Sequence, residues 1–451
     1  MNSPNQKLYP QIVVAPPGPR AQVIIDLDHK YTSPSYIKEY PLVIDHGEGP
    51  WVYDVDGNRY LDMMAGIAVT STGHAHPHVV KAIQEAAAKF LHICGTDFYY
   101  QSFADLCARL ANYLPEMGPK KVFLSNSGTE AVEGAIKLSR MHTRRQTIIA
   151  FKGAFHGRTM GAISLNSSKV TQRAFFGPLM PGVMHIPYPH PKKCPHGKQA
   201  SFCATQCACA DVLSNDWFLS HVDPREVAAI FVEPILGEGG YVVPPRKFLQ
   251  DLRDLCDKYG IVLVFDEVQS GIGRTGDIFA AETMGVMPDV ICSAKGIASG
   301  MPIGAIIARE SVMTWGRGTH GSTYGGNPVC CAAALATLDV VEELMPQVKR
   351  VGAYLQAQLV ELQKKHPVIW DVRGEGLMIG AEFLDPTTHA PAQKLVGDLE
   401  QLAFRKGLLL LSCGKSTIRF APPLVVTEHE IDITIRLLDE CLTELAAAEA
   451  T

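Results

Sequence analysis

Apolar residues follow two different spacings between about residues 75 and 340. The segments PHVVKAIQEAAAKF, QSFADLCARLANYL and RKFLQDLRDLCDKYG place them every three or four positions, as in a helix packed on a core. Between such segments lie short runs that are apolar throughout: KVFLSNSG, TIIAFKG, VAAIFVEPI, IVLVFDEV, DVICSAKG and IGAIIARE. Strands that are apolar on both faces are typical of parallel sheets covered by helices. The pattern predicts an α/β domain with a mostly parallel sheet over residues 75–340.

The C-terminal residues 341–451 have a different pattern. Long helical segments, LMPQVKRVGAYLQAQLVELQKKH and EIDITIRLLDECLTELAAAE, flank the short strand-like runs LMIGAEFL, GLLLLSCG and TIRFAPPL. We assign 341–451, together with residues 1–74, to a second and smaller α+β domain. The proline-rich stretch VVAPPGPR near the start predicts a loose or wrapped arm.

Composition narrows the class of protein. The chain has 451 residues, of which 47% are hydrophobic and 19% charged, and its formal net charge is −5 with no long basic run. Nucleic acid and anionic membranes are therefore not expected partners. No apolar run reaches the roughly 18 residues of a membrane helix, and MNSPNQKLYPQ lacks the features of a signal peptide. Twelve cysteines are too sparse for a disulfide scaffold, so we expect a cytoplasmic enzyme with reduced cysteines.

Polar and reactive side chains follow several of the predicted strands. VFLSN leads into Ser127-Gly128-Thr129, IVLVF ends in Asp266-Glu267, and VICSA ends at Lys295. Ligands of open parallel sheets bind beyond the carboxyl ends of the strands. The clustering of these residues at strand ends predicts an active site there.

Lys295 and Asp266 together suggest a specific cofactor. A lysine just past an apolar strand is desolvated, which makes its amine more nucleophilic and able to form a Schiff base. Pyridoxal phosphate needs such a lysine at its aldehyde and an acid that keeps its ring nitrogen protonated. Taken alone, Lys295 could equally be a lysine that reaches solvent, and Asp266 a turn residue or helix cap.

The neighbouring strand ends could hold the rest of such a cofactor. Ser127 and Glu130 have capping-box spacing, so the helix that begins there offers backbone N–H groups to a phosphate. Phe155, in GAFHGRT, offers an aromatic face to a flat ring. A plain helix cap and a core phenylalanine are the alternatives for these residues.

Seven stretches give the sequence a recognisable resemblance: FLSNSGTEAVEGAIKLSR, FHGRTMGAIS, EPILGEGG, DEVQSGIGRTG, SAKGIASGMPIGA, HGSTYGGNPVCCAAALA and IRFAPPL. In this order, from about Pro50 to Pro423, they resemble the class III pyridoxal-phosphate aminotransferases, the 4-aminobutyrate and ornithine aminotransferase group. The resemblance implies fold type I, which has a large cofactor domain and a small domain built from both ends of the chain.

The resemblance also implies a role for individual residues. Lys295 matches the Schiff-base lysine, and Asp266 matches the acid on the ring nitrogen. Thr323 matches a residue that reaches the phosphate of the neighbouring subunit, which implies a homodimer or a larger dimer-based oligomer. The remaining positions implied to contact the cofactor are Gly128, Thr129, Phe155, His156, Val268 and Gln269.

Three charged residues match the substrate-binding residues of the family: Arg158, Glu238 and Arg419. Two arginines can bind the two carboxylates of glutamate, but an ω-amino acid leaves one arginine without a carboxylate partner. Glu238 matches a glutamate that closes on Arg419 in that case. We therefore predict transamination of 4-aminobutyrate, or next of ornithine, with 2-oxoglutarate as the acceptor. The alternative for Glu238 and Arg419 is a permanent ion pair. By its position, Ile67 matches a residue of an apolar pocket wall, and the alternative for it is a residue of the core.

Two other activities compete with this prediction. Some relatives of the family are amino-acid racemases or epimerases, and the long arm before position 50 and the stretch MPGVMHIPYPHPKKCP fit that branch equally well. The G-x-G-x-x-G spacing of GIGRTG would instead suggest a nicotinamide-dependent oxidoreductase. However, its glycines begin five residues after the strand, and no strong helix follows them.

A cysteine-rich stretch, CPHGKQASFCATQCACAD, departs from most of the family. Cys194, His196, Cys203, Cys207 and Cys209 could together hold zinc or an iron–sulfur cluster. Their spacing matches no familiar signature. We therefore expect a surface insertion with reduced thiols or an occasional disulfide, and no bound metal.

Overall fold

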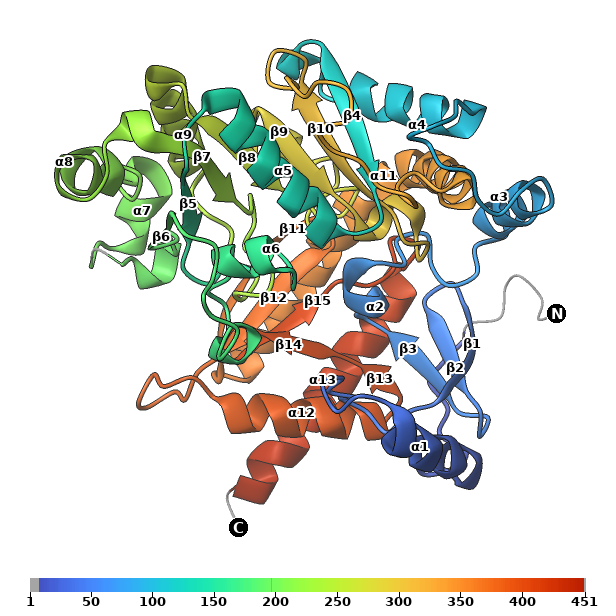
Figure 1. Cartoon of the computed structure of the whole chain (residues 1–451). Coiled ribbons are helices and arrows are strands. Elements are labelled where there is room, and N and C mark those ends of the chain that lie inside the picture. The colour runs from blue at the N-terminus through green and yellow to red at the C-terminus, as the bar shows by residue number, and fades with distance from the viewer. Residues whose placement is uncertain (1–7, 196, 450–451) are drawn as a thin grey trace. The chain divides into compact units, whose positions relative to one another are not determined.

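The computed structural model describes residues 8–195 and 197–449 (Figure 1). The chain divides into two compact units, one formed by residues 77–346 and the other by the segments before and after it. Helix α11 (Pro328–Lys365) runs through the second boundary, which falls at Pro346, whereas the sequence placed that boundary at residue 340. No helix among the described residues is both long and apolar enough to cross a membrane.

A seven-stranded sheet forms the centre of the unit 77–346. Its strand order is β4-β10-β9-β8-β7-β5-β6. Neighbouring strands from β9 to β6 are parallel, whereas β10 is antiparallel to both β4 and β9. The mostly parallel sheet predicted for this region is thus confirmed. The strands are Lys120–Ser125 (β4), Thr147–Phe151 (β5), Val183–Ile186 (β6), Val227–Val232 (β7), Val262–Asp266 (β8), Val290–Ser293 (β9) and Gly304–Arg309 (β10).

Helix α5 (Gly128–Thr143) packs across the middle of this sheet. Its buried residues Val132 and Ile136 join Phe231, Val264 and Ile306 of the strands in one hydrophobic core. Strands in the middle of the sheet are buried on both faces, which explains why β7 and β8 are apolar throughout. The other helices of the unit are Pro77–Ala87 (α3), Gln101–Asn112 (α4), Met160–Leu165 (α6), Ala200–Gln206 (α7), Phe218–Ser220 (α8), Arg246–Tyr259 (α9) and Ala280–Met284 (α10).

The other unit contains two four-stranded sheets, with strand orders β1-β2-β3-β13 and β11-β12-β15-β14. The strands are Ile44–Glu48 (β1), Trp51–Asp54 (β2), Arg59–Asp62 (β3), Ile369–Glu375 (β11), Met378–Phe383 (β12), Leu408–Leu409 (β13), Leu411–Cys413 (β14) and Thr417–Phe420 (β15). The helices are Pro19–Tyr31 (α1), Ala65–Ala68 (α2), Gln393–Arg405 (α12) and Glu428–Glu449 (α13). Strand β13 pairs with β3 in parallel, so the two ends of the chain share a sheet.

The N-terminal arm wraps on this unit. The backbone N–H groups of Val13 and Val14 both donate to the Asn58 side chain, at 2.7 and 2.9 Å, and Gln11 forms a bridge with Arg59. The prediction of a loose or wrapped arm missed helix α1, whose weakly amphipathic sequence gives little periodic signal. Its N-terminus is held by Asp56, whose carboxylate accepts the N–H groups of residues 20 and 21.

Candidate active site

The predicted catalytic residues lie at one edge of the seven-stranded sheet. Asp266 is the last residue of β8, and Lys295 begins a short 3₁₀ turn, η6 (Lys295–Ala298), two residues after β9. Because β8 and β9 are parallel neighbours, their carboxyl ends open on the same side. The fold therefore brings Asp266 and Lys295 to adjacent strand ends, as the sequence predicted.

Asp266 is fixed by two contacts and is only 5% exposed. One carboxylate oxygen lies 2.7 Å from Nδ1 of His156, and the other accepts the backbone N–H of Val268 at 3.0 Å. Burial lowers the pKa of His156, but the hydrogen bond to Asp266 and the charges of Asp266 and Glu233 together raise it above its usual value. The contacts with His156 and Val268 therefore hold both oxygens of the Asp266 carboxylate in place.

Glu233 is a buried acid that the sequence interpretation missed. It directly follows β7, and its two oxygens accept the backbone N–H groups of Phe155 (2.9 Å) and Gly237 (2.7 Å). Burial raises its pKa to about 7, against the lowering effect of His156. Glu233 therefore ties together the loops that follow β5 and β7. Its position directly after an apolar strand was the signal that could have identified it.

The N-terminus of α5 lies against the loop that follows β8. A Cβ placed on Gly128 would approach Val268 to 2.8 Å, so only glycine allows the two segments to come this close. Ser127 accepts the N–H of Glu130 at 3.3 Å, but the Glu130 carboxylate accepts the N–H of Asn126 rather than that of Ser127. Only the first hydrogen bond of the predicted capping box is therefore formed. In place of the second, the Glu130 carboxylate binds the residue before Ser127.

Thr129 faces the loop after β5. Its hydroxyl lies 2.7 Å from the Thr159 hydroxyl and 2.2 Å from the place that a Cβ on Gly157 would occupy. Phe155 is half-buried in the same loop, and the exposed guanidinium of Arg158 lies 5.6 Å from the centre of its ring. The start of α5 therefore approaches the loop after β8 through Gly128 and Val268, and the loop after β5 through Thr129 and Gly157.

Lys295 is half-buried and has a φ of +47°, an uncommon conformation for a residue with a side chain. Backbone strain of this kind is concentrated at functional sites. Gln269, after β8, accepts a hydrogen bond from the Tyr241 hydroxyl at 2.7 Å, which fixes the orientation of its amide.

Glu238 has a partner that the sequence did not suggest. One of its carboxylate oxygens lies 2.8 Å from Nζ of Lys169, a lysine of the same unit that is about half-exposed. The Glu238 side chain itself is 15% exposed. The carboxylate therefore has a cation beside it that does not depend on any substrate.

Arg419 and Ile67 belong to the other unit. Arg419 lies in β15 and is 4% exposed. The positive charge of Arg419 acts on the buried carboxyl of Glu400 on α12, a second acid that the sequence interpretation missed. Burial raises the pKa of Glu400 to about 7, and Arg419 acts against this increase.

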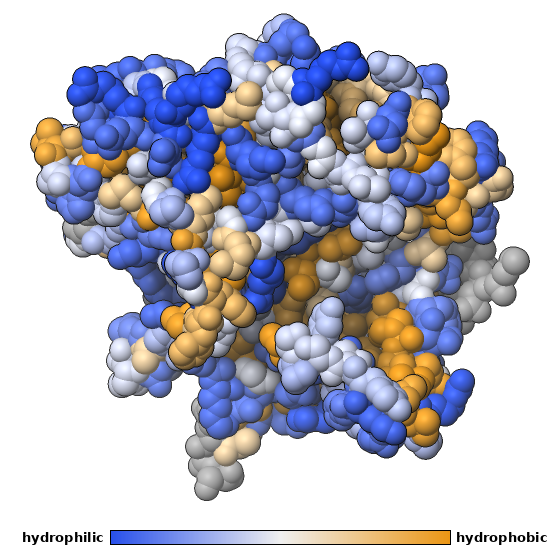
Figure 2. Space-filling view, in the orientation of Figure 1, coloured by the Kyte–Doolittle hydropathy of each residue, from blue (hydrophilic) through white to orange (hydrophobic). Residues whose placement is uncertain are grey.

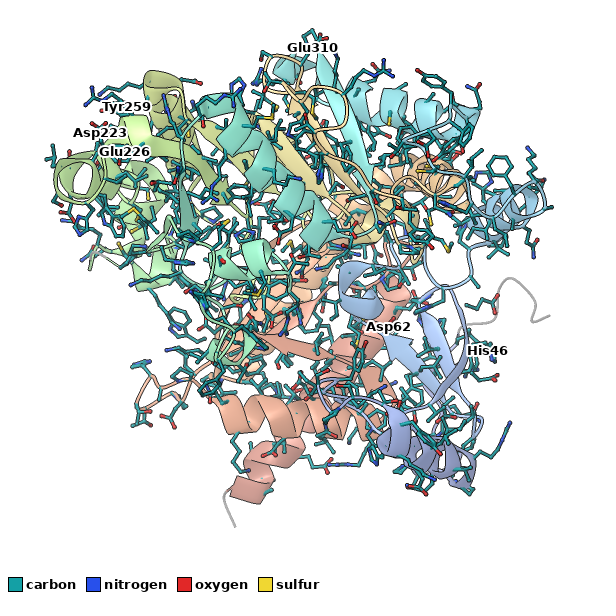
Figure 3. All side chains as sticks on the ribbon, viewed as in Figure 1. His46, Asp62, Asp223, Glu226, Tyr259 and Glu310 are labelled. Carbon is teal, nitrogen blue, oxygen red and sulfur yellow. The ribbon has the colours of Figure 1, made fainter. Side chains whose placement is uncertain are left out.

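Ile67 lies in a left-handed turn formed by the residues of α2. Four successive residues have positive φ, from Ala65 (48°) through Gly66 and Ile67 (67°) to Ala68 (61°). Asp62, at the end of β3 (Figure 3), accepts the N–H groups of residues 64 and 65 at 2.9 Å each, and lies 2.8 Å from His74. Ile67 is 42% exposed, so it is not a core residue.

Thr323 is exposed, in the segment between β10 and α11. Next to it, Tyr324 is 63% exposed and packs on His92 with ring centroids 5.0 Å apart. Large apolar side chains of residues 90–99 are exposed as well, and Figure 2 shows apolar surface in the region of α3 and α4. These side chains are Phe90, Leu91, Phe98 and Tyr99.

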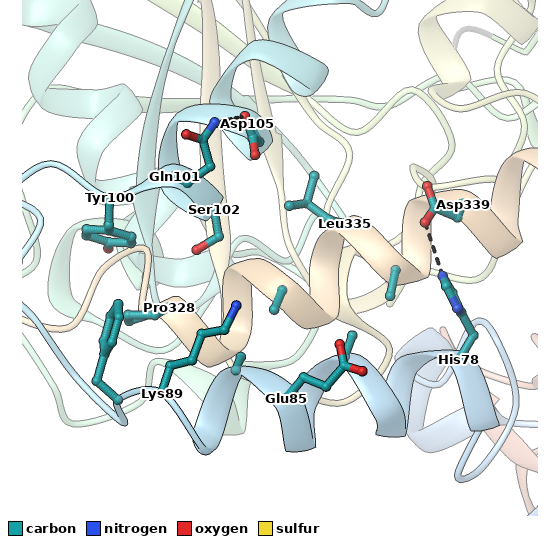
Figure 4. A pocket seen from close by; sticks show the side chains of 15 residues that line it. His78, Glu85, Lys89, Tyr100, Gln101, Ser102, Asp105, Pro328, Leu335 and Asp339 are labelled. Carbon is teal, nitrogen blue, oxygen red and sulfur yellow. Dashed lines mark hydrogen bonds and ion pairs between the residues drawn. The ribbon is translucent and has the colours of Figure 1, made fainter.

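A separate groove of about 540 Å³ lies among α3, α4 and the start of α11 (Figure 4). Its lining includes Lys89, Tyr100 and Leu335, and it is closed at one end by the 3.1 Å contact of His78 with Asp339. None of the predicted site residues lines this groove. The strand-end residues described above therefore remain the candidate active site.

The glycine-rich stretch after β8 does not form a dinucleotide loop. Residues 271–276 are a run of buried turns, and the next helix, α10, begins only at Ala280. Its first N–H groups, from Ala280 and Ala281, donate to Glu267 at 2.6 and 2.8 Å. Glu267 thus caps α10, and no helix N-terminus is left at the glycines for a pyrophosphate.

The site fits pyridoxal phosphate in three respects. Nε2 of His156 is buried and has no hydrogen-bond partner among the described residues, in a position next to Asp266. Gly128 and Gly157 allow backbone to approach where a Cβ would collide. Lys295 and Asp266 supply the amine and the acid that this cofactor requires.

The chain is similar to known proteins over nearly its whole length. Residues 32–442 match the family model described as aminotransferase class-III. An alanine/serine racemase from Pyrococcus horikoshii is 41% identical over 446 residues, covering 97% of this chain and 93% of the relative. A 5-aminovalerate aminotransferase from Pseudomonas aeruginosa is 41% identical over 413 residues, covering 90% and 95%.

The solved structures lead to the same family. The ornithine aminotransferase from Toxoplasma gondii ME49 matches with a TM-score of 0.82 at 30% identity, covering 96% of each chain. The predicted fold type I, the pyridoxal-phosphate cofactor and the family resemblance are thereby confirmed. The chain belongs to the class III aminotransferases, which are pyridoxal-phosphate-dependent enzymes.

Proposed function

We propose that the protein transfers the amino group of an ω-amino acid to 2-oxoglutarate. The preferred donors are 4-aminobutyrate and its homologue 5-aminovalerate, followed by ornithine. The family supports transamination, and the similarity to a 5-aminovalerate aminotransferase supports an ω-amino donor. The observation that carries the proposal is the ion pair of Glu238 with Lys169.

The residues at the strand ends take the roles that the family motif assigns to them. When bound, pyridoxal phosphate supplies an electron sink for the negative charge that develops on the substrate carbon. Lys295 would hold the cofactor through its amine and would move the proton at that carbon. Asp266, which His156 holds in place, would keep the ring nitrogen protonated. The N-terminus of α5, with Gly128 and Thr129, would bind the phosphate, and Phe155, Val268 and Gln269 would lie against the ring.

The Glu238–Lys169 pair explains how one site accepts two kinds of substrate. Arg419 would bind the carboxylate of glutamate next to the reacting carbon, and Arg158 the distal carboxylate. With an ω-amino donor, Glu238 would neutralise Arg419. When glutamate displaces it, Glu238 needs another cation, because a desolvated and unpaired carboxylate is costly. Lys169 is that cation, and Ile67 would form the apolar wall between the charged ends.

An amino-donor panel tests the proposal. We expect the purified enzyme to form glutamate from 2-oxoglutarate with 4-aminobutyrate or 5-aminovalerate. Glu238→Gln should slow the ω-amino half-reaction about tenfold, which is the effect expected from the loss of roughly one partly exposed ion pair. The glutamate half-reaction should slow much less. Glu310→Gln, which alters a surface glutamate paired with Lys121, is the matched control and should leave both half-reactions unchanged. Equal slowing of both half-reactions by Glu238→Gln would contradict the switch.

Racemisation or epimerisation of an α-amino acid is the second candidate. The observation that favours it is the 41% identity to an alanine/serine racemase over 97% of the chain, which includes the N-terminal arm. Inversion of L-alanine or L-serine without any 2-oxo acid, monitored by chiral chromatography, would identify this activity. A glutamate product that depends on an ω-amino donor would identify the transaminase.

We also propose that the enzyme is at least a homodimer. Exposed aromatic and aliphatic side chains are concentrated at residues 90–99 and at Tyr324, and apolar groups that gather on a surface often mark an interface between proteins. Thr323 lies beside them, where it could reach a neighbouring subunit's phosphate. Light scattering should give the mass of a dimer. Thr323→Ala should weaken cofactor retention without changing that mass, whereas a monomeric and fully active enzyme would refute the assignment.

A further inference from the structure

The segment that carries Thr323 connects β10 to α11 and spans residues 310–327. The structure describes all of these residues, and none of them belongs to a helix or strand. Long connections without regular structure are uncommon in compact domains and usually have a function. Thr323 is exposed, whereas Ser322 before it is half-buried and Gly325 and Gly326 after it are buried. The segment is therefore fixed on both sides of Thr323, while the Thr323 side chain stays accessible.

Ser322 joins this segment to the beginning of α5. Its hydroxyl oxygen accepts a hydrogen bond from the side-chain amide of Asn126 at 3.1 Å and another from the backbone N–H of Gly325 at 2.9 Å. The second bond closes a turn around Thr323. A Cβ on Gly325 would approach the carbonyl oxygen of Leu124 in β4 to 2.5 Å, so only glycine lets the turn lie this close to the strand. The turn that presents Thr323 is thus tied to the junction of β4 and α5.

Asn126 occupies this junction and is held by Glu130. Its backbone N–H and its side-chain amide both donate to the same Glu130 carboxylate oxygen, at 2.6 and 3.0 Å. Because a carboxylate only accepts hydrogen bonds, this contact fixes which end of the amide is the nitrogen. One hydrogen of that nitrogen points to Glu130 and the other to Ser322. Since Glu130 directly follows Gly128 and Thr129, the hydrogen bonds lead from the start of α5 to the turn at 322–325.

A second contact holds the segment at another point. Nδ1 of His320 lies 2.9 Å from Nζ of Lys137 on α5, and the His320 ring packs on Phe123 with centroids 4.6 Å apart. Burial and the charge of Lys137 lower the pKa of His320, so its neutral ring can accept a hydrogen bond from the lysine. Loss of the bond from Asn126 should therefore loosen the turn without releasing the whole segment.

We propose that Asn126 is a positioning residue, which acts through Ser322 to hold Thr323 where it binds the phosphate of pyridoxal phosphate in the neighbouring subunit. This inference rests on the homodimer and on the role of Thr323 proposed above. A hydroxyl on a loose turn loses conformational freedom when it binds, and a turn that is already fixed loses less. Asn126 lies next to the phosphate-binding residues of its own subunit, but its effect is on the other subunit's site.

The cofactor affinity of single variants tests the proposal. Asn126→Ala and Ser322→Ala remove opposite ends of one hydrogen bond, so each should weaken the binding of pyridoxal phosphate to the cofactor-depleted enzyme by up to about tenfold. Thr323→Ala should weaken it at least as much, and Asn126→Ala added to Thr323→Ala should cause little further loss, because both act through one contact. Absorbance titration measures the affinity. Asn215→Ala, at an exposed asparagine between β6 and β7, is the matched control and should bind as the parent does.

Mixed dimers of differently tagged chains show in which subunit Asn126 acts. In the first, one chain carries Asn126→Ala and the other Lys295→Ala, so the absorbance of cofactor bound to Lys295 reports only the site of the first chain. That site receives Thr323 from a chain with Asn126 and should keep parent affinity. In the second, one chain carries both substitutions and the other neither, and the reporting site should bind as weakly as the Asn126→Ala homodimer. The reverse pattern would show that Asn126 acts on its own site and would overturn the proposal. Ser322→Ala replaces Asn126→Ala in both dimers if that chain does not fold.

The same measurements separate the positioning role from the dimer assignment. Parent-like affinity in Thr323→Ala, or chains that form no mixed dimers, would overturn both. Weakened binding in Thr323→Ala with parent-like binding in Asn126→Ala and Ser322→Ala would overturn the positioning role and leave the dimer assignment intact.

Discussion

The carboxyl edge of the seven-stranded sheet and the connection between β6 and β7 (residues 187–226) belong to the same unit, but they hold their side chains in place by different means. At the sheet edge, the register of β8 and β9 fixes where Asp266 and Lys295 lie. Buried hydrogen bonds such as that of Asp266 with His156 fix their orientation. The described residues of the connection form no strand, and its buried side chains include Cys203, Cys207 and Cys209. His196, in the same cysteine-rich stretch, lies outside the described residues.

We infer from this difference that the sheet edge determines mainly the reaction, whereas the connection affects mainly the stability of the fold. Substitutions at the sheet edge should change the reaction and leave the fold intact, because the backbone there is held by the sheet. Substitutions of Cys203, Cys207 or Cys209, the buried cysteines of the connection, should change stability and leave the reaction intact. The following predictions test this separation in order of decreasing effect.

Lys295→Ala should lower turnover by at least about 10⁴-fold, because no other amine follows β9 to take the proton from the substrate carbon. Circular dichroism and thermal unfolding should remain close to those of the parent. Single-turnover assays with each half-reaction provide the measurement. Parent-like turnover in this variant would show that another residue does the chemistry.

Asp266→Asn should lower turnover by about 10² to 10³-fold, the typical effect of removing one preorganised charge. The amide keeps the size of the side chain but no longer holds the ring nitrogen protonated. Retention of the cofactor in the variant, measured by its absorbance after gel filtration, separates lost chemistry from lost binding. An enzyme as fast as the parent would place the Asp266 carboxylate away from the ring.

Glu233→Gln should flatten the pH dependence of stability. Because burial raises the pKa of Glu233 to about 7, the folded state binds a proton between about pH 4.5 and 7 that the unfolded state does not. The free energy of unfolding therefore decreases by up to about 3 kcal/mol as the pH rises through this window. Glutamine does not titrate, so the variant should not show this decrease. Denaturant unfolding at several pH values measures the slope. Parallel curves for variant and parent would mean that Glu233 is charged throughout.

Cys207→Ser/Cys209→Ser should lower the midpoint of thermal unfolding by several degrees, about 2–4 °C for each kcal/mol lost, because both side chains are buried and a hydroxyl is more costly to bury than a thiol. Turnover at room temperature should stay within about twofold of the parent, because neither cysteine belongs to the proposed reaction site. A large loss of turnover at unchanged stability would break the separation between the two regions.

The residues that sequence reasoning identified are those whose position is set by local pattern. Asp266 and Lys295 end apolar strands, and parallel strands bring their ends together whatever the details of packing. Glu233 and Glu400 were missed because their importance comes from burial, which depends on chain segments distant in sequence. The partner of Glu238 was missed for the same reason, since Lys169 lies in a separate loop and carries no motif.

The sequence predicted the fold about as completely as it predicted the candidate site. The strands of the large sheet were recognisable as apolar runs, with the exception of β6, whose sequence VMHI carries a histidine. The antiparallel direction of β10 was not used in the sequence interpretation, although the connection from β9 to β10 is too short for the crossover helix that parallel neighbours usually require. The runs LMIGAEFL, GLLLLSCG and TIRFAPPL do contain β12 to β15 of the smaller sheets. Helix α1 and strand β1 were not predicted, because their residues are mostly exposed and follow no clear period.

The left-handed turn at residues 65–68 has a consequence for changing the substrate range of this enzyme. A left-handed conformation costs a residue with a side chain roughly 1–2 kcal/mol, and glycine almost nothing. At Ile67, which we propose as the pocket wall, glycine would therefore relax the backbone and at the same time enlarge the pocket. Directed evolution for larger donors and selection for heat resistance would both favour glycine there. Selection for the original small donor would retain the strained isoleucine.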